Sequence, residues 1–327
     1  MECRICRSKI EEPPLFVKEM MFGTGITYPY YRCEGCSCLQ IEQPEKNSEN
    51  LYPVTYYSFN TYNTFNIINW IKKLTIKHSV AVSLGHNSIL NFLLGNKYRD
   101  YGAHALKGKV KKSERILDIG CGDGSLIIAL SCLGYKNLTG IDPYLSTNII
   151  KPDYQLLKKN IETLEDAEKY DVIMLHHSFE HVENPGNVME NINRLLKKNG
   201  LCIIRIPVAD SFACNFYKEY WVQTDAPRHV FLHSNKSMQL LSSQNGLFIE
   251  SIVNDSTEFQ FIGSEQYKIG ISLNDQRSYY VPPYKKTFLN KKHPFAKKDI
   301  KKYQRQAVLL NKEGKGDQRI FYLRKCL

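Results

Sequence analysis

The fold is decided by one stretch of the chain, Arg115-Ile116-Leu117-Asp118-Ile119-Gly120-Cys121-Gly122-Asp123-Gly124-Ser125. The apolar residues 116–119 predict a short buried strand, and the apolar run 126–130 predicts the helix that follows it. Between them, glycines stand at every second position. Because glycine lacks a Cβ and tolerates positive φ, a ligand can approach the bare backbone of such a turn. The unpaired N–H groups at the start of the helix favour a negatively charged ligand atom.

A second acid, Asp142, follows Gly122 by 20 residues and ends the apolar stretch 138–141. In a doubly wound sheet, a carboxylate at this position accepts hydrogen bonds from ribose hydroxyls. A nicotinamide-binding fingerprint would read G-x-G-x-x-G, but Ser125 stands where its last glycine would be. The observed pattern, D-x-G-x-G-x-G from Asp118, resembles motif I of the class I S-adenosylmethionine-dependent methyltransferases. An NAD site and a turn without a ligand are the alternative interpretations.

The composition is that of an ordinary soluble protein, with 43% hydrophobic and 24% charged residues among 327. This length accommodates one large α/β domain and a small accessory one. No apolar run approaches the roughly 20 residues of a membrane helix, and Met-Glu-Cys-Arg does not begin a signal peptide. Ten cysteines without such a signal indicate metal ligation or buried thiols, so we expect a cytoplasmic protein.

Four of the cysteines form two knuckles, Cys3-x-x-Cys6 and Cys33-x-x-Cys36, separated by 26 residues. Two such knuckles bring four thiolates to the corners of a tetrahedron, the geometry that zinc prefers. A closed site with four cysteines leaves no position for a substrate, so the predicted zinc is structural. Cys38 is a spare thiol that could replace Cys36. A redox-active pair is the alternative, but the surrounding pattern is not thioredoxin-like.

The net charge of +11 arises from the C-terminal part of the chain. From residue 281 onward there are 14 Lys and Arg against three acids, whereas the first 280 residues hold 30 of each sign. One interpretation is a basic helix that only contacts solvent. The others are contacts with the phosphates of a nucleotide-linked substrate, with anionic lipid, or with RNA.

The chain after residue 113 alternates predicted strands and helices, which is typical of a parallel α/β sheet. The expected fold is a Rossmann-like, doubly wound sheet of seven strands. Besides the strands that end at Asp118 and Asp142, we expect strands at residues 154–157, 170–175, 201–207, 247–254 and 318–323.

Titratable residues follow the predicted strand 170–175, at the sheet edge where open α/β folds bind ligands. His176 and His177 suit contact with the cofactor. Glu180 and His181 have a structural alternative, as a buried acid–imidazole pair. A catalytic metal in this group is a further alternative.

A second group of such residues lies in the loop 225–234 before a predicted helix. His229 and His233 are candidate bases, because an imidazole near its usual pKa can remove a proton. Asp225 could orient an imidazole, and Arg228 could hold an anionic substrate. The alternative is a helix-entry loop held by its own polar contacts.

Taken together, the chain resembles bacterial class I methyltransferases with an N-terminal zinc-binding module, which are often associated with sugar and surface-polysaccharide biosynthesis. The resemblance is carried by the two knuckles, residues 56–59, 117–124, 179–182 and 225–229, and by Gly316-Asp317 with residues 321–323. It implies a small zinc-ribbon-like module at 1–42, a helical connector or lid at 43–112, and a methyltransferase domain at 113–327 with a lid insertion at 256–304.

The resemblance further implies S-adenosylmethionine as cofactor, a structural Zn²⁺, and methyl transfer to a nucleotide-linked or lipid-linked sugar. Alternatives are an RNA methyltransferase and a non-catalytic cofactor-binding protein. Residues 1–42 argue against nucleic acid, with five Lys and Arg against six acids. Peripheral membrane contact stays open, and oligomeric state is not predicted. The candidate site residues are catalytic His229, His233 and His181; cofactor-binding Asp118, Gly120, Cys121, Gly122, Gly124, Asp142, Pro143, Asn160, Ile161, His176 and His177; and zinc-binding Cys3, Cys6, Cys33 and Cys36.

Overall fold

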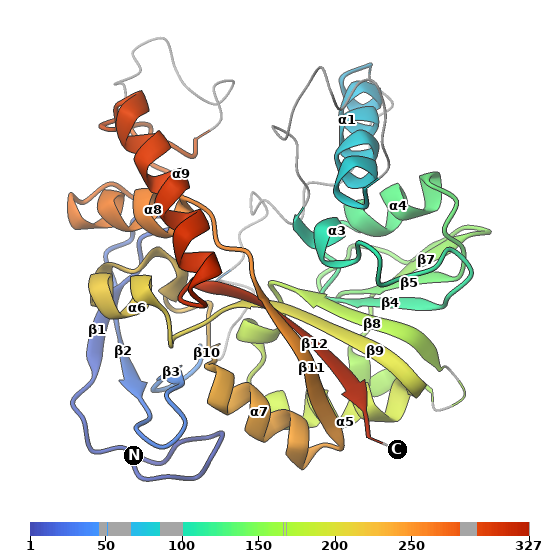
Figure 1. The fold of residues 1–327 in the computed structure, drawn as a ribbon, viewed down its shortest axis with the longest axis horizontal. Coiled ribbons are helices and arrows are strands. Elements are labelled where there is room, and N and C mark those ends of the chain that lie inside the picture. The colour runs from blue at the N-terminus through green and yellow to red at the C-terminus, as the bar shows by residue number, and fades with distance from the viewer. Residues whose placement is uncertain are drawn as a thin grey trace.

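The central feature of the fold is an eight-stranded sheet (Figure 1). The computed structural model describes residues 1–45, 51, 67–85, 101–165, 167, 169–281 and 293–326. The strand order is β11 (Leu247–Asn254), β12 (Gln318–Lys325), β9 (Leu196–Pro207), β8 (Tyr170–His176), β4 (Ile116–Ile119), β5 (Leu138–Ile141), β7 (Tyr154–Leu157) and β6 (Ile149–Ile150). All of the expected strands form. The expected count of seven was wrong, because the two-residue β6 adds a short antiparallel edge to β7.

The strands from β7 to β9 run parallel, whereas β12 is antiparallel to both of its neighbours. Because side chains alternate along each strand, the sheet buries two apolar faces. On β8, for example, Ile173 and Leu175 belong to one core cluster, and Val172 and Met174 belong to the other. The register places Asp118 beside Gly140, which sets the glycine-rich turn next to the end of β5.

Helices cover both faces, as a doubly wound sheet requires (Figure 1). The elements α1 (Ile67–Ser83), α3 (Tyr101–Ala105) and α4 (Ser125–Cys132) lie on one face, and α5 (Pro185–Leu195) and α7 (Asn235–Gln244) lie on the other. Beyond one end of the sheet stand α6 (Phe212–Tyr217), α8 (Phe259–Lys268) and α9 (Lys297–Lys312). Helix α8 lies within the predicted insertion at 256–304, and α9 begins in it and continues to Lys312. The stretch 56–59 and other parts of the predicted connector at 43–112 lie outside the described residues.

The N-terminal module shares its small sheet with the main domain. Its strands β1 (Leu15–Lys18), β2 (Thr27–Arg32) and β3 (Leu39–Ile41) are antiparallel, and β3 also pairs with β10 (Phe231–Leu232) from the predicted catalytic loop. Its buried residues are part of the same core cluster as one face of the central sheet. The module therefore supports the loop that carries His229.

Candidate active site

The turn after β4, which we call the glycine loop (residues 118–124), has the backbone geometry that its sequence predicts. Gly120, Gly122 and Gly124 have φ values of 73°, 56° and 75°. A Cβ on Gly120 would collide with Ser178, and a Cβ on Gly124 would collide with Leu156. Side chains at these positions would therefore be both strained and obstructed.

Asp142 closes the glycine loop from the end of β5. Its carboxylate accepts hydrogen bonds from the backbone N–H groups of Gly122 (3.0 Å) and Tyr144 (2.9 Å). Burial raises the pKa of Asp142, and these two amides partly oppose the effect. Asp118 is buried at the end of β4. Two acids thus flank bare backbone at the carboxyl edge of the sheet, an arrangement suited to a ribose and an adjoining cationic group.

The other predicted cofactor residues line the same edge. Cys121 lies inside the glycine loop, where its N–H donates to Ile141 O, and Pro143 follows Asp142 directly. Asn160 and Ile161 stand at the start of a 3₁₀ turn after β7, with Ile161 buried and Asn160 exposed. Parallel strands bring these separate segments to one edge, as expected.

His176 and His177 end β8 in different environments. Neither ring nitrogen of His176 has a hydrogen-bond partner among the described residues, and burial together with Arg205 lowers its pKa to about 3. His177 has a φ of 51°, uncommon for a residue with a side chain. Its Nε2 accepts from Arg205 (2.6 Å), so its Nδ1 donates to Glu180 (3.2 Å). Ser178 then donates to Ile119 O (2.8 Å), which ties this segment to the glycine loop.

We use the name acid–imidazole cluster for three side chains that lie between β8 and β10 in the sequence: Glu180, His181 and His229. One ligand atom from each lies within 4.8 Å of the others. Glu180 is 0% exposed, and its Oε1 lies 3.9 Å from His229 Nε2. Burial alone would raise the pKa of Glu180, but its interactions with His177 lower it to about 2.

The tautomers of both cluster histidines follow from backbone contacts. His181 Nδ1 donates to Arg228 O (2.9 Å), and His229 Nδ1 donates to Gln223 O (2.7 Å). In the neutral form of each ring, the Nε2 atom therefore carries the lone pair. Burial lowers the pKa of His229 to about 4, with His181 adding to the effect and Asp225 opposing it. His229 is thus neutral near pH 7.

A buried ion-pair network holds the loop that carries His229. Arg228 is 2% exposed and donates to both carboxylate oxygens of Asp225 (2.9 and 2.6 Å) and to Glu19 (2.9 Å). Tyr30 donates to His229 O (2.8 Å). Arg228 was expected to hold an anionic substrate group, but its partners here are two carboxylates of the protein.

His233 occupies a different environment from His229. It is fully buried and stacks between Phe179 (5.0 Å between ring centroids) and Phe231 (5.7 Å). Its Nδ1 lies 3.4 Å from Ser237 Oγ, beside the start of α7. Ser234 caps that helix. The structure gives His233 a packing position, whereas His181 and His229 lie together.

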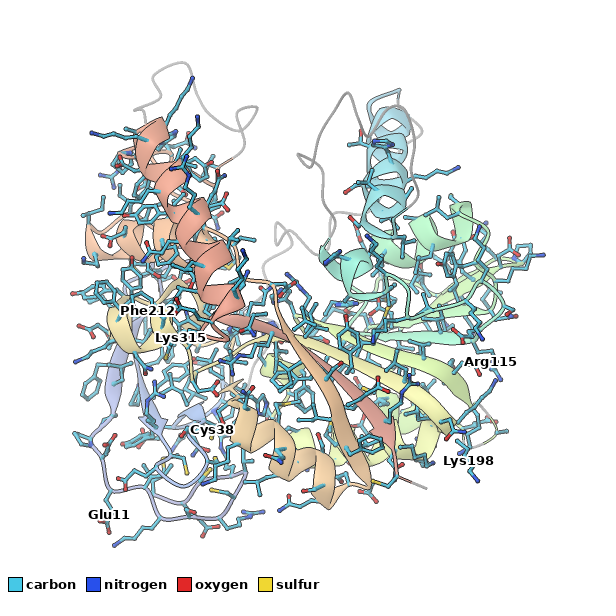
Figure 2. The ribbon with its side chains drawn as sticks, in the orientation of Figure 1. Glu11, Cys38, Arg115, Lys198, Phe212 and Lys315 are labelled. Atoms are coloured by element: carbon cyan, nitrogen blue, oxygen red, sulfur yellow. The ribbon has the colours of Figure 1, made fainter. Side chains whose placement is uncertain are left out.

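The predicted zinc ligands converge in the N-terminal module, and we call Cys3, Cys6, Cys33 and Cys36 the thiolate cluster. Their Sγ atoms lie within 4.8 Å of one another, with Cys3–Cys36 at 3.7 Å and Cys6–Cys33 at 3.4 Å. A tetrahedral zinc with Zn–S bonds of about 2.3 Å separates its sulfurs by about 3.8 Å, so the residues fit zinc. The Sγ of Cys38, labelled in Figure 2, contacts only part of the cluster, Cys3 (3.7 Å) and Cys36 (3.4 Å).

Sequence reasoning missed four residues that support the acid–imidazole cluster, namely Glu19, Tyr30, Arg205 and Asp255. Glu19 accepts a hydrogen bond from Arg228, and Tyr30 donates one to His229 O. Both come from the N-terminal module, and no local sequence pattern predicts their roles. Arg205 donates to Asp255 (2.6 Å), and this pair extends the Glu180–His177 contact into β9 and β11. A signal did exist for Arg205, because it is the one charge in the apolar run 201–207.

Other surfaces also bear on the predictions. Helix α9 exposes Lys297, Lys298, Lys301, Lys302 and Arg305, and none of them forms an ion pair within the described residues. Among those residues, no helix has the length and apolar character needed to cross a membrane.

Residues 94–252 match a family model described as a methyltransferase domain. The chain is similar to the ubiquinone biosynthesis O-methyltransferase of Rickettsia bellii, with 38% identity over 99 residues that cover 27% of this chain and 40% of the relative. The protein of that name from Rickettsia conorii is 29% identical over 153 residues, covering 41% and 52%. The chain therefore spans only 40% to 52% of the length of these curated relatives.

The comparison with solved structures gives low scores. A methyltransferase of Thermotoga maritima, described as a possible histamine N-methyltransferase, has a TM-score of 0.42 and 16% identity, covering 79% of this chain and 96% of that one. A putative S-adenosylmethionine-dependent methyltransferase from Listeria monocytogenes has a TM-score of 0.40 and 14% identity, covering 68% and 97%.

Proposed function

We propose that the chain transfers a methyl group to a hydroxyl of a small acceptor. The premise is that it carries a class I S-adenosylmethionine-dependent methyltransferase domain. The observation that carries the proposal is the glycine loop, with left-handed glycines and the buried acids Asp118 and Asp142 at one sheet edge. The sulfonium activates the methyl group, so the protein must mainly align the acceptor and remove its proton.

The acid–imidazole cluster is the proposed place of acceptor activation. Ser178 connects its segment to the glycine loop, so the cluster adjoins the cofactor end of the sheet. His229 presents a neutral Nε2, which can accept the hydroxyl proton. His181 orients the acceptor beside it. The environment of His233 supports a structural role, in holding the loop through Phe179 and Phe231.

The proposed acceptor is a nucleotide-linked or lipid-linked sugar. Support comes from the N-terminal module, whose thiolate cluster fits a structural zinc. The exposed cations of α9 supply complementary charge for a phosphate or diphosphate linkage. A phenolic hydroxyl is the second candidate, because the curated relatives are named ubiquinone biosynthesis O-methyltransferases.

Calorimetry with S-adenosylhomocysteine tests the cofactor assignment. We expect one molecule bound per chain and weaker binding by Asp142→Ala; absence of binding would contradict the proposal. Incubation with a methyl-labelled donor and matched pools of nucleotide sugars, lipid-linked sugars and catechols then tests the acceptor. His229→Ala should abolish transfer to the true acceptor while cofactor binding persists. Full turnover by that variant would remove His229 from the chemistry.

A further inference from the structure

The acid–imidazole cluster has the composition of a metal site. Two imidazoles and one carboxylate converge from two separate segments, with one ligand atom of each within 4.8 Å of the others. Such a set suits a divalent transition metal and leaves coordination positions open. We propose that Glu180, His181 and His229 bind a divalent transition-metal cation, separate from the zinc of the thiolate cluster.

The first support is the orientation of both imidazoles. A histidine that binds a metal through one nitrogen usually donates its other N–H to a carbonyl or carboxylate, which fixes the ring and its tautomer. Here both Nδ1–H groups donate to backbone carbonyls, of Arg228 and of Gln223. Both Nε2 atoms are thereby the ones that carry lone pairs.

The second support is an unsatisfied oxygen. Glu180 is 0% exposed, and its Oε2 has no hydrogen-bond partner among the described residues. A buried carboxylate oxygen without a partner costs several kcal/mol, so such oxygens normally bind a donor or a metal. The carboxylate of Glu180 is also fixed in place, because its Oε1 accepts from His177.

The third support is charge balance. The hydrogen-bonded network around the cluster contains four carboxylates, those of Glu19, Glu180, Asp225 and Asp255. It contains two guanidinium groups, those of Arg205 and Arg228. In this largely buried region, the carboxylates of the described network therefore outnumber its guanidinium groups by two. One divalent cation neutralises that excess.

The expected ion is of the Mn²⁺, Fe²⁺ or Zn²⁺ class. Nitrogen ligands disfavour Mg²⁺ and Ca²⁺, which prefer oxygen. The thiolate cluster has the opposite preference, because soft sulfur ligands select zinc and not manganese. Mn²⁺ can thus report on the acid–imidazole cluster while zinc occupies the thiolate cluster.

The catalytic part of this inference rests on the proposed methyl transfer to a hydroxyl, but it replaces His229 as the base, because an Nε2 that binds the cation has no lone pair left for a proton. An acceptor hydroxyl at an open metal position loses its proton to solvent more readily, because the cation lowers its pKa. The oxygen lone pair then forms the O–CH₃ bond, and the S–CH₃ bond breaks with its electron pair retained on sulfur. The products are the methyl ether, S-adenosylhomocysteine and one proton. Direct proton transfer to His229 is the competing mechanism, and it needs no cation.

Electron paramagnetic resonance of free Mn²⁺ tests the site in protein that holds one zinc per chain, because excess zinc would also occupy the acid–imidazole cluster. We expect the wild type to bind one Mn²⁺ per chain saturably. Glu180→Gln and His229→Gln should each raise the dissociation constant more than about a hundredfold. The matched control is Glu183→Gln, an exposed acid in the same segment, which should bind normally. No Mn²⁺ bound by the wild type, or equal binding by Glu180→Gln, would overturn the inference.

Two further measurements separate this inference from the proposed function. Thermal unfolding and S-adenosylhomocysteine calorimetry on each variant show whether fold and cofactor site persist. Absence of cofactor binding would reject the proposed function, while the resonance titration would still decide the cation site. Equal methyl transfer with and without Mn²⁺, in protein shown to bind it, would overturn the catalytic role of the cation.

Discussion

The glycine loop and the acid–imidazole cluster meet the same edge of the sheet, but they are built differently. The glycine loop is continuous in sequence and is held mainly by backbone hydrogen bonds to β5 and Asp142. The acid–imidazole cluster joins a segment after β8 to a loop some 50 residues later, and one salt bridge and one hydrogen bond from the N-terminal module support it.

Because of this difference, substitutions in the two regions should have different effects on ligand binding and stability. The glycine loop depends on local backbone conformation, so its changes should affect ligand binding and should cost less stability than changes to the buried ion pairs. The acid–imidazole cluster depends on buried charges that compensate one another across distant segments. Removal of one buried charge leaves its partners without a counter-charge, so such a change should lower the stability of the whole fold.

The largest expected effect is that of Arg228→Ala, which leaves Asp225 and Glu19 buried without their counter-charge. We expect a loss of about 3–5 kcal/mol in the free energy of unfolding, measured by urea denaturation of zinc-loaded protein. Arg228→Lys should lose less, because it keeps the charge. The control is Arg324→Ala, whose partly exposed pair with Glu250 should contribute less than about 1 kcal/mol. Equal costs at Arg228 and Arg324 would contradict the distinction.

A second prediction contrasts this network with a carboxyl group that has only neutral partners. Although burial would raise it, the Arg228 guanidinium holds the pKa of Asp225 below its usual range. Asp317 accepts from Trp221 Nε1 (3.0 Å), and burial raises its pKa to about 6.

Since the folded state binds the Asp317 proton more tightly than the unfolded chain, stability should fall as the pH rises from about 4 to about 6. The loss is about 3 kcal/mol from this group. Asp317→Asn should flatten that part of the profile, as measured by denaturation at several pH values. An unchanged profile would assign the dependence to other groups.

The same contrast explains what could be predicted from the sequence. Asp118, the glycines and Asp142 lie within 25 residues, so spacing alone predicted the strands, the turn and an acid at the end of β5. The two knuckles were predictable for the same reason. The partners of Arg228 were not, because Glu19 precedes it by more than 200 residues and only the shared sheet of β3 and β10 brings them together. The two-residue β6 was missed because so short a strand has no periodicity.

A third prediction concerns the glycine loop itself. Asp142→Asn keeps the shape of the side chain but removes the charge, so S-adenosylhomocysteine should bind about ten- to a hundredfold more weakly. The free energy of unfolding should change little, because burial already disfavours the charged form. Calorimetry and denaturation of one preparation measure both quantities. Asp123→Asn is the control, because its carboxylate bonds to Ser125 at the start of α4 and does not close the loop. Equal affinities for both variants would remove Asp142 from the binding site.

The smallest expected effect is that of Gly124→Ala, which separates backbone strain from crowding. Gly124 has a φ of 75°, where any other residue costs about 1–2 kcal/mol, and its added Cβ would press on Leu156. Gly108 has a φ of 67° with no atom within 4 Å of such a Cβ, so Gly108→Ala measures the conformational cost alone. Urea denaturation should give a larger loss at Gly124 than at Gly108. Equal losses would mean that Leu156 moves aside at no cost, and that the glycine loop depends on backbone conformation alone.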